Sequence, residues 1–302
     1  MVTLLIGFGG VSAHADAQGS PAALPKAPAP YSIPWQLRPA TVGTGIRLDS
    51  SLGFWRDSTR RDGATRVIGI VGSRKVSERV ALVGRLSIVD NRPPASGPEK
   101  GARVISNPLI GAAFLRNRPG GRRGTLFVAA TLPLGTGGGD SPRPEQTAAL
   151  SRAIATRSAM DNALFAVNYF TLIGGLSVAR VTPGATVQAE ATVLQLFRVR
   201  GPMAQDQYRT NFTAGVHLGR SFRPRISVGL DLRYQRWLSD AAPVRASREA
   251  RETWTLAFGP RLHFKFSGSK WIRPGLSLTL PLDRPLSGQR YRMLQIDVPV
   301  SF

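Results

Sequence analysis

Histidine is the residue type in this 302-residue chain that could most readily supply acid–base chemistry, and there are three. His14 lies in an apolar leader, whereas His217 and His263 lie on the polar side of alternating segments. A catalytic base must lie within reach of its nucleophile, and no recognisable nucleophile motif surrounds either of these two histidines. The chain has no cysteine and no H-x-x-x-H or D-x-D spacing, so thiol catalysis and zinc knuckles are excluded. We therefore expect no enzyme, no metal site and no cofactor.

The glycine-rich segment 135–140 (GTGGGD) invites comparison with a phosphate-binding loop. A phosphate loop continues with lysine and serine or threonine at the start of a helix, and this segment does not. We interpret it as a flexible external loop.

The charged residues with the most functional promise share one parity of the alternating segments. On this parity, six basic residues stand against four acidic residues: Arg47, Arg85, Arg233, Arg261, Lys265 and Arg273 against Asp49, Glu190, Asp231 and Asp297. If the segments are strands, all ten side chains point to the same side. Two interpretations stay open: the charges pair and fill a narrow interior, or the small positive surplus lines a path that modestly favours anions.

The elements that must position these charges are strands. Residues 252–266, 225–237 and 271–282 each alternate apolar residues with polar, small or charged ones. Strict alternation predicts a strand with two unlike faces, and its recurrence is typical of a membrane β-barrel. The alternation is interrupted near Tyr169–Leu172, which predicts a bulge or a strand that overhangs the membrane.

The connections between the alternating segments are short and long in turn. Short ones lie near 76–78, 117–123, 182–185, 222–224 and 267–269, and longer ones near 56–66, 91–103, 135–160, 200–207, 239–250 and 283–289. Outer-membrane barrels have short periplasmic turns and long external loops. The pattern predicts an all-β fold, a single antiparallel up-and-down transmembrane barrel of about twelve strands with both termini in the periplasm. A soluble β-sandwich is the competing fold.

The two ends of the chain are consistent with export. Residues 1–17 contain an apolar run and A-x-A cleavage sites, which predicts a signal peptide, although a positively charged start is missing. Residues 18–41 hold six prolines and are interpreted as a periplasmic arm. We assign 42–302 to the barrel.

The last ten residues, 293–302, place Leu294, Ile296, Val298, Val300 and Phe302 on one parity. This segment resembles the terminal strand of bacterial outer-membrane barrels, which ends in an aromatic residue. The resemblance implies that the barrel-assembly machinery reads Phe302 as an insertion signal, with outer-membrane lipids as the surroundings.

A second resemblance covers about 35 residues. Segment 130–140 (ATLPLGTGGGD) is similar to the glycine-rich loop segment of the meta-pathway phenol-degradation family of outer-membrane transporters. Segment 107–114 (NPLIGAAF) is similar to that family's Asp-Pro strand start, with Asn107 in place of the acid and Leu134 in place of a threonine. The resemblance implies a channel associated with hydrophobic or aromatic solutes, without catalytic residues.

The formal charge of +22 comes from arginine, since only five of the 40 basic residues are lysine. The arginines are scattered at strand-like spacing, so we do not expect a nucleic-acid partner. Helical spacing of Ala149, Leu150, Ala153, Ile154 and Arg157 predicts a short helix within 145–160. This helix either folds over or into the barrel mouth, or is an exposed turn.

These observations predict an outer-membrane channel or transporter-like protein for passive passage of small hydrophobic, aromatic or anionic solutes. Two alternatives stay open: a non-conducting barrel with a lumen filled by side chains, and a lipid-modifying barrel enzyme.

Overall fold

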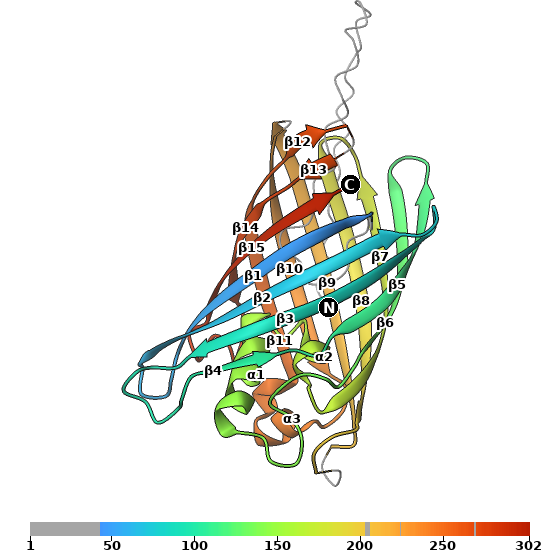
Figure 1. Ribbon diagram of the computed structural model, residues 1–302. Coiled ribbons are helices and arrows are strands. Elements are labelled where there is room, and N and C mark those ends of the chain that lie inside the picture. The colour runs from blue at the N-terminus through green and yellow to red at the C-terminus, as the bar shows by residue number, and fades with distance from the viewer. Residues whose placement is uncertain (1–42, 203–205, 224, 269) are drawn as a thin grey trace, which may run out of the picture.

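The chain forms one continuous antiparallel sheet (Figure 1). The computed structural model describes residues 43–202, 206–223, 225–268 and 270–302. The predicted signal peptide and periplasmic arm lie outside these residues and stay predictions. The strands are β1 (Gly45–Arg56), β2 (Asp62–Lys75), β3 (Val80–Arg92), β4 (Ala102–Ile105), β5 (Leu109–Arg118), β6 (Arg122–Thr131), β7 (Tyr169–Val181), β8 (Ala185–Arg198), β9 (Tyr208–Arg223), β10 (Ile226–Trp237), β11 (Glu252–Leu262), β12 (Phe264–Ser267), β13 (Lys270–Ile272), β14 (Gly275–Pro281) and β15 (Arg292–Ser301).

The sheet closes on itself. The order runs β1-β2-β3-β5-β6-β7-β8-β9-β10-β11-β14-β15, and β15 pairs with β1 along its length, from Gly45 opposite Ser301 to Phe54 opposite Arg292. β4 adds to β3 at one end of the wall, and β12 and β13 form a short hairpin at the other. The predicted antiparallel barrel is confirmed, with twelve strands.

The connections alternate as the sequence predicts. Residues 76–79, 119–121 and 182–184 make short turns at one end of the barrel, whereas 132–168 and 238–251 make long connections at the other. The helices lie at the end with the long connections, away from the β5–β6 turn (Figure 1). By the rule for outer-membrane barrels, the helical end is external and the end with short turns is periplasmic.

The two faces of the wall differ in chemistry. Outward side chains are largely apolar and exposed, among them Ile70, Leu126, Leu176 and Val178, as a lipid-facing surface requires. Inward side chains are buried and in most places polar, as at Ser87, Thr171 and Gln295. Of the helices among the described residues, none has the length and apolar character needed to cross a membrane.

The long β6–β7 connection enters the barrel. It contains α1 (Pro144–Thr156) and α2 (Asn162–Phe165), and we call residues 144–165 the plug. Residues 156–165 are all buried, and the backbone N–H of Asn107 on the wall donates to the carbonyl of Leu164 at 2.8 Å. The predicted helix, α1, thus buries one face at the mouth through Ala149, Leu150 and Ala153, and the residues that follow it lie inside the barrel. A second external connection carries α3 (Ala242–Ala246) and a 3₁₀ turn (Arg248–Arg251).

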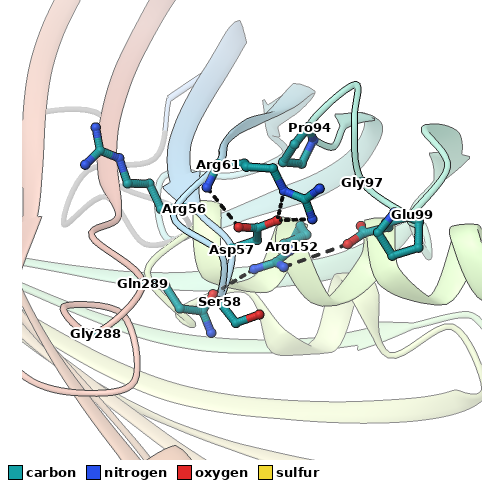
Figure 2. Close-up of a pocket in the computed structure, with 11 residues that line it drawn as sticks. Arg56, Asp57, Ser58, Arg61, Pro94, Gly97, Glu99, Arg152, Gly288 and Gln289 are labelled. Carbon is teal, nitrogen blue, oxygen red and sulfur yellow. Dashed lines mark hydrogen bonds and ion pairs between the residues drawn. The ribbon is translucent and has the colours of Figure 1, made fainter.

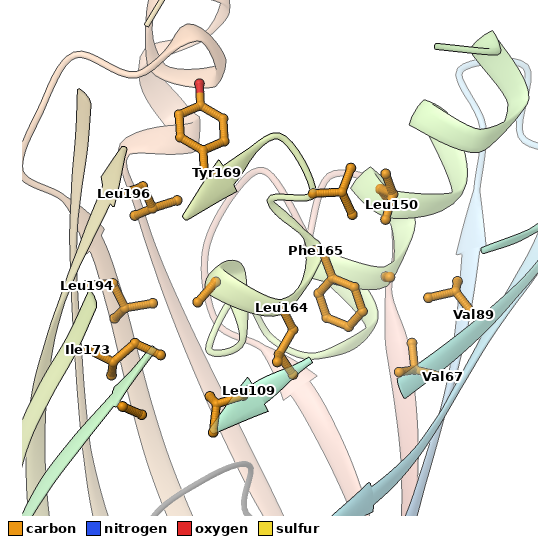
Figure 3. Packing of buried hydrophobic residues seen from close by; sticks show 14 of the residues in the cluster. Val67, Val89, Leu109, Leu150, Leu164, Phe165, Tyr169, Ile173, Leu194 and Leu196 are labelled. Carbon is orange, nitrogen blue, oxygen red and sulfur yellow. The ribbon is translucent and has the colours of Figure 1, made fainter. Parts of the chain in front are cut away.

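Apolar contacts join the plug to the external half of the wall. Leu150, Leu164 and Phe165 face a patch of inward apolar side chains (Figure 3), namely Val67, Val89, Leu109, Ile173, Leu194 and Leu196. All of these residues are buried. Each fully buried aliphatic or aromatic side chain contributes about 1.5–3 kcal/mol, so this patch is a main source of plug stability.

Two strands of the wall approach each other closely at Gly259, where β11 meets β14. A Cβ at this position would lie 1.9 Å from the carbonyl oxygen of Leu276, and pairing is already interrupted between Phe258 and Arg261. We expect Gly259→Ala to destabilise the barrel by about 1–3 kcal/mol, because the strands must separate. The measurement is the temperature at which the unboiled, faster gel band is lost. Gly174→Ala is the control, since a Cβ at Gly174 meets no atom within 4 Å; equal melting of the two variants would contradict the prediction.

Candidate functional site

The structure places nine of the ten charged residues of the predicted lumen lining on the inner face of the wall. They are Arg47, Asp49, Arg85, Glu190, Asp231, Arg233, Arg261, Arg273 and Asp297. All except Arg47 are buried, and Arg47 lies 3.8 Å from Asp49. Glu190 accepts a 3.4 Å hydrogen bond from Gln188. Lys265 is the exception, because it lies in the β12–β13 hairpin and is exposed.

An ion-pair cluster fixes the plug to the wall. Asp161 of the plug accepts hydrogen bonds from both terminal nitrogens of Arg85, at 3.0 and 2.9 Å, and from Nε of Arg157 at 2.9 Å. Arg157 also donates to Ser51 at 2.6 Å and to Asp49 at 3.3 Å. We call Asp49, Arg85, Arg157 and Asp161 the clamp.

The clamp joins residues far apart in the chain, at a site shielded from bulk solvent. Asp49 lies on β1, Arg85 on β3, and Arg157 and Asp161 on the plug; each side chain is at most 3% exposed. A buried ion pair is only a modest net source of stability, but removal of one partner leaves an uncompensated charge and costs about 3–5 kcal/mol. The clamp therefore stabilises the one conformation in which the plug lies inside the barrel.

A second network lies on the inner face of β9, β10 and β15. Nδ1 of His217 lies 2.5 Å from Asp231, and Arg233 pairs with Asp231 at 3.1 Å. Arg233 also donates to Gln295 on β15 at 3.0 Å, although β10 and β15 are not neighbours in the sheet. Arg233 therefore links two strands of the wall that are separated in the sheet by β11 and β14.

A third group lies toward the periplasmic end. Arg261 pairs with Asp297 at 2.9 Å and donates to the carbonyl of Arg273 at 2.6 Å. The hydroxyl of Ser227 lies 2.8 Å from Nε2 of His263. This serine–histidine contact escaped the sequence reasoning, because the two residues are 36 positions apart.

The contact between Ser227 and His263 lacks the other parts of a hydrolytic site. Nδ1 of His263 has no hydrogen-bond partner among the described residues, and Ser227 is 1% exposed. A catalytic base is normally oriented by a third group, and its nucleophile must reach substrate. Asp231 orients the other histidine, His217, instead. The described residues also contain no cluster of three metal-ligating side chains.

An external pocket of about 450 Å³ adjoins the plug (Figure 2). Arg152 of α1 reaches into it, with its guanidinium 3.6 Å above the ring of Trp55 and a 2.7 Å hydrogen bond to Gln289. The carboxylate of Glu99 lies 3.9 Å from the same guanidinium of Arg152. Burial raises the pKa of the adjacent Tyr291 phenol to about 12. The plug helix is therefore in contact with the β14–β15 connection at the mouth.

The charges of the β1–β2 loop also face this pocket. Arg61 pairs with Asp57 at 2.9 Å and donates to the carbonyl of Ser96 at 2.7 Å. Desolvation raises the pKa of Asp57, but hydrogen bonds from Thr59 and Arg61 outweigh it and lower this pKa to about 2. Asp57 thus remains ionised at any physiological pH.

Asp206 joins two other external connections. It pairs with Arg209 at 2.7 Å and with Arg245 at 2.5 Å, and it accepts a 2.6 Å hydrogen bond from the backbone of Ala242 at the start of α3. Desolvation raises the pKa of Asp206, but these partners dominate and hold it below its usual value. The β8–β9 connection and α3 are therefore held together beside the mouth.

The carboxy-terminal Phe302 lies just beyond β15, where the barrel closes. Its backbone N–H donates to the carbonyl of Thr44 at 3.0 Å, and its side chain is exposed. Its role as an insertion signal stays a prediction.

Comparison with solved structures shows what the fold is similar to. The chain is similar to the COG4313 outer membrane channel from Pseudomonas putida F1, with 11% identity, coverage of 86% of this chain and 96% of that chain, and a TM-score of 0.53. Weaker likenesses are to the NanC porin (7% identity, 84% and 98% coverage, TM-score 0.49) and to the KdgM porin (8%, 85% and 99%, 0.46). No protein-family model and no curated protein sequence matches the chain.

The match to the Pseudomonas putida channel concerns the fold. At 11% identity it shows that this chain shares the closed antiparallel β-barrel fold of an outer-membrane channel.

Proposed function

We propose that this protein is an outer-membrane channel for passive passage of small solutes, and that the plug closes its external half in the conformation described. The observation that carries the proposal is the clamp, through which an external connection is fixed inside a closed twelve-stranded barrel. Ion pairs between a loop and a wall can break without unfolding the wall, since the strands keep their own ladder hydrogen bonds. The plug is therefore suited to act as a gate.

The chemistry of the wall indicates the class of solute. Displacement of the plug would uncover the inward apolar patch, including Leu109, Ile173 and Leu194, in the external half. Deeper in the lumen, the inward basic residues Arg47, Arg233, Arg261 and Arg273 accompany the acidic residues Glu190, Asp231 and Asp297, a surplus of one basic residue. A path with apolar and mildly basic zones suits small solutes with an apolar body, and should favour anions modestly.

Single-channel recording in planar bilayers tests the gate. We expect the wild-type protein to be mostly closed and a variant lacking residues 145–158 to conduct more, with a reversal potential in a salt gradient that favours anions modestly. Persistence of the heat-dependent gel shift is the control that the deletion variant still forms a barrel. A deletion variant that folds but conducts no more than the wild type would reject the gate.

The burial of the inner face favours a second candidate, a non-conducting barrel with a filled lumen. Thr279, Gln295 and Arg233 have no exposed area, and Arg233 reaches across to another part of the wall. This candidate requires that neither the wild type nor the deletion variant conducts. The same recording therefore separates the two functions.

A further inference from the structure

An arginine-lined groove lies on the outside of the barrel, at the end opposite the plug. It has a volume of about 520 Å³ and extends over β5, β6, β7 and β8. Its basic lining residues are Arg116, Arg118, Arg122, Arg123 and Arg180. All except Arg123 are on the outward parity of their strands, the one that holds the lipid-facing side chains Phe114, Leu126 and Val178.

The strand register brings three of these arginines side by side. Arg118 lies opposite Arg122, and Arg122 lies opposite Arg180, on three adjacent strands. Like charges in directly opposite positions destabilise a sheet. Among the described residues that line the groove there is no aspartate or glutamate, and these three arginines form no ion pair with the described part of the chain. A bound anion would offset their repulsion.

The next position toward the middle of the barrel provides an apolar floor. Arg116 lies opposite Gly124, which lies opposite Val178. Gly124 has no side chain to fill the groove, and a Cβ there would meet only the carbonyl oxygen of Arg116, at 4.0 Å. Beyond it, Phe114, Leu126 and Leu176 form an exposed apolar surface. The groove thus passes from a basic edge to an apolar wall within a few residues.

We propose that this groove binds an anionic phospholipid of the periplasmic leaflet, with the headgroup phosphate on Arg118, Arg122 and Arg180 and an acyl chain over Gly124 and Val178. Guanidinium groups bind phosphate oxygens in bidentate geometry. The short turns place this end of the barrel in the periplasm, where the leaflet consists of phospholipid. Clusters of lysine and arginine beside a membrane surface attract anionic lipid headgroups by charge. This site is independent of solute passage through the lumen.

Native mass spectrometry of the full chain, released from detergent that contains equal amounts of dioleoyl phosphatidylglycerol and dioleoyl phosphatidylcholine, tests the proposal. We expect the wild type to retain phosphatidylglycerol preferentially. A variant with Arg116→Gln, Arg118→Gln, Arg122→Gln and Arg180→Gln should retain at least about tenfold less. Both must show the heat-dependent gel shift of a folded barrel. Equal retention by the two would overturn the site.

The matched control removes the same charge at the same end of the barrel but outside the groove: Arg74→Gln, Arg79→Gln, Arg220→Gln and Arg223→Gln. All four of these arginines are exposed. We expect this variant to retain phosphatidylglycerol as the wild type does. A loss as large as in the groove variant would show a diffuse effect of net charge and would overturn the site.

A further variant distinguishes a lipid from free phosphate. Gly124→Phe would fill the apolar floor and leave every arginine in place, so it should lower phosphatidylglycerol retention. Excess inorganic phosphate should not displace the lipid from the wild type, because phosphate has no acyl chain to occupy the floor. Full retention by Gly124→Phe, or displacement by phosphate alone, would identify a phosphate site and overturn the lipid proposal.

Discussion

Replacement of Asp161 by asparagine should shift the ratio of closed to open channel toward open by about a hundredfold or more. Asp161 is the plug carboxylate that neutralises Arg85 and Arg157, and all three side chains are buried. Removal of one partner from such a group costs about 3–5 kcal/mol, and each 1.4 kcal/mol is a factor of ten. Asparagine has nearly the same shape, so the packing of the plug is otherwise preserved. The open fraction in single-channel recording measures the effect.

Asp140→Asn is the matched control for this variant. Asp140 lies in the same β6–β7 connection and is exposed, and the substitution is chemically identical. The control should leave the open fraction unchanged, because no buried charge loses its partner. If Asp161→Asn also stays mostly closed, the clamp does not hold the plug in place, and the gate must be sought elsewhere.

The sequence predicted the wall well, because the wall is governed by a simple physical requirement. Membrane strands must present apolar side chains to lipid on every second residue, so parity alone assigned Asp49, Arg85 and Asp231 to the inner side of the barrel. The alternation of short and long connections is a consequence of the up-and-down topology. Lys265 was assigned to the lumen by the same parity, but β12 extends beyond the closed part of the barrel, where inward parity no longer means burial.

The plug was only half predicted, because it follows no alternating pattern. Helical spacing identified α1, yet spacing cannot distinguish a helix over the mouth from one inside it. Asp161 lies in the turn between α1 and α2, outside any periodic pattern, so nothing in the sequence paired it with Arg85, which is 76 residues earlier in the chain. The Arg152–Trp55 contact at the mouth was missed for the same reason.

One signal in the sequence could have located the plug. Strands in contact with it are apolar on both parities: Val67 and Val71 alternate with Ile68 and Ile70 on β2. Ile173 on the inner face of β7 likewise follows Leu172 on the outer face. A strand with two apolar faces is covered on both sides. The alternation near Tyr169–Leu172 is interrupted because β7 carries apolar side chains on both faces there. The predicted bulge is wrong, since β7 pairs in unbroken register with β6 and β8.

A disulfide between the plug and the wall should abolish opening until it is reduced. A Cβ on Gly53 of β1 would lie 3.1 Å from the Cβ of Thr156 at the end of α1. Disulfides have Cβ–Cβ separations of about 3.5–4.5 Å, so Gly53→Cys with Thr156→Cys needs only a small adjustment. The Thr156 hydroxyl has no hydrogen-bond partner among the described residues, and the chain has no other cysteine to mispair.

The double-cysteine variant should show no openings after oxidation and wild-type openings after addition of reductant, whereas each single-cysteine variant should be insensitive to both. The disulfide also tests the effect of the clamp. A channel that carries Asp161→Asn in the oxidised double-cysteine background should stay closed. Breaking the clamp can increase conduction only if the plug is free to move. If the oxidised protein conducts as the reduced protein does, ions pass while the plug is fixed, and the plug is then a structural filling of the barrel rather than its gate.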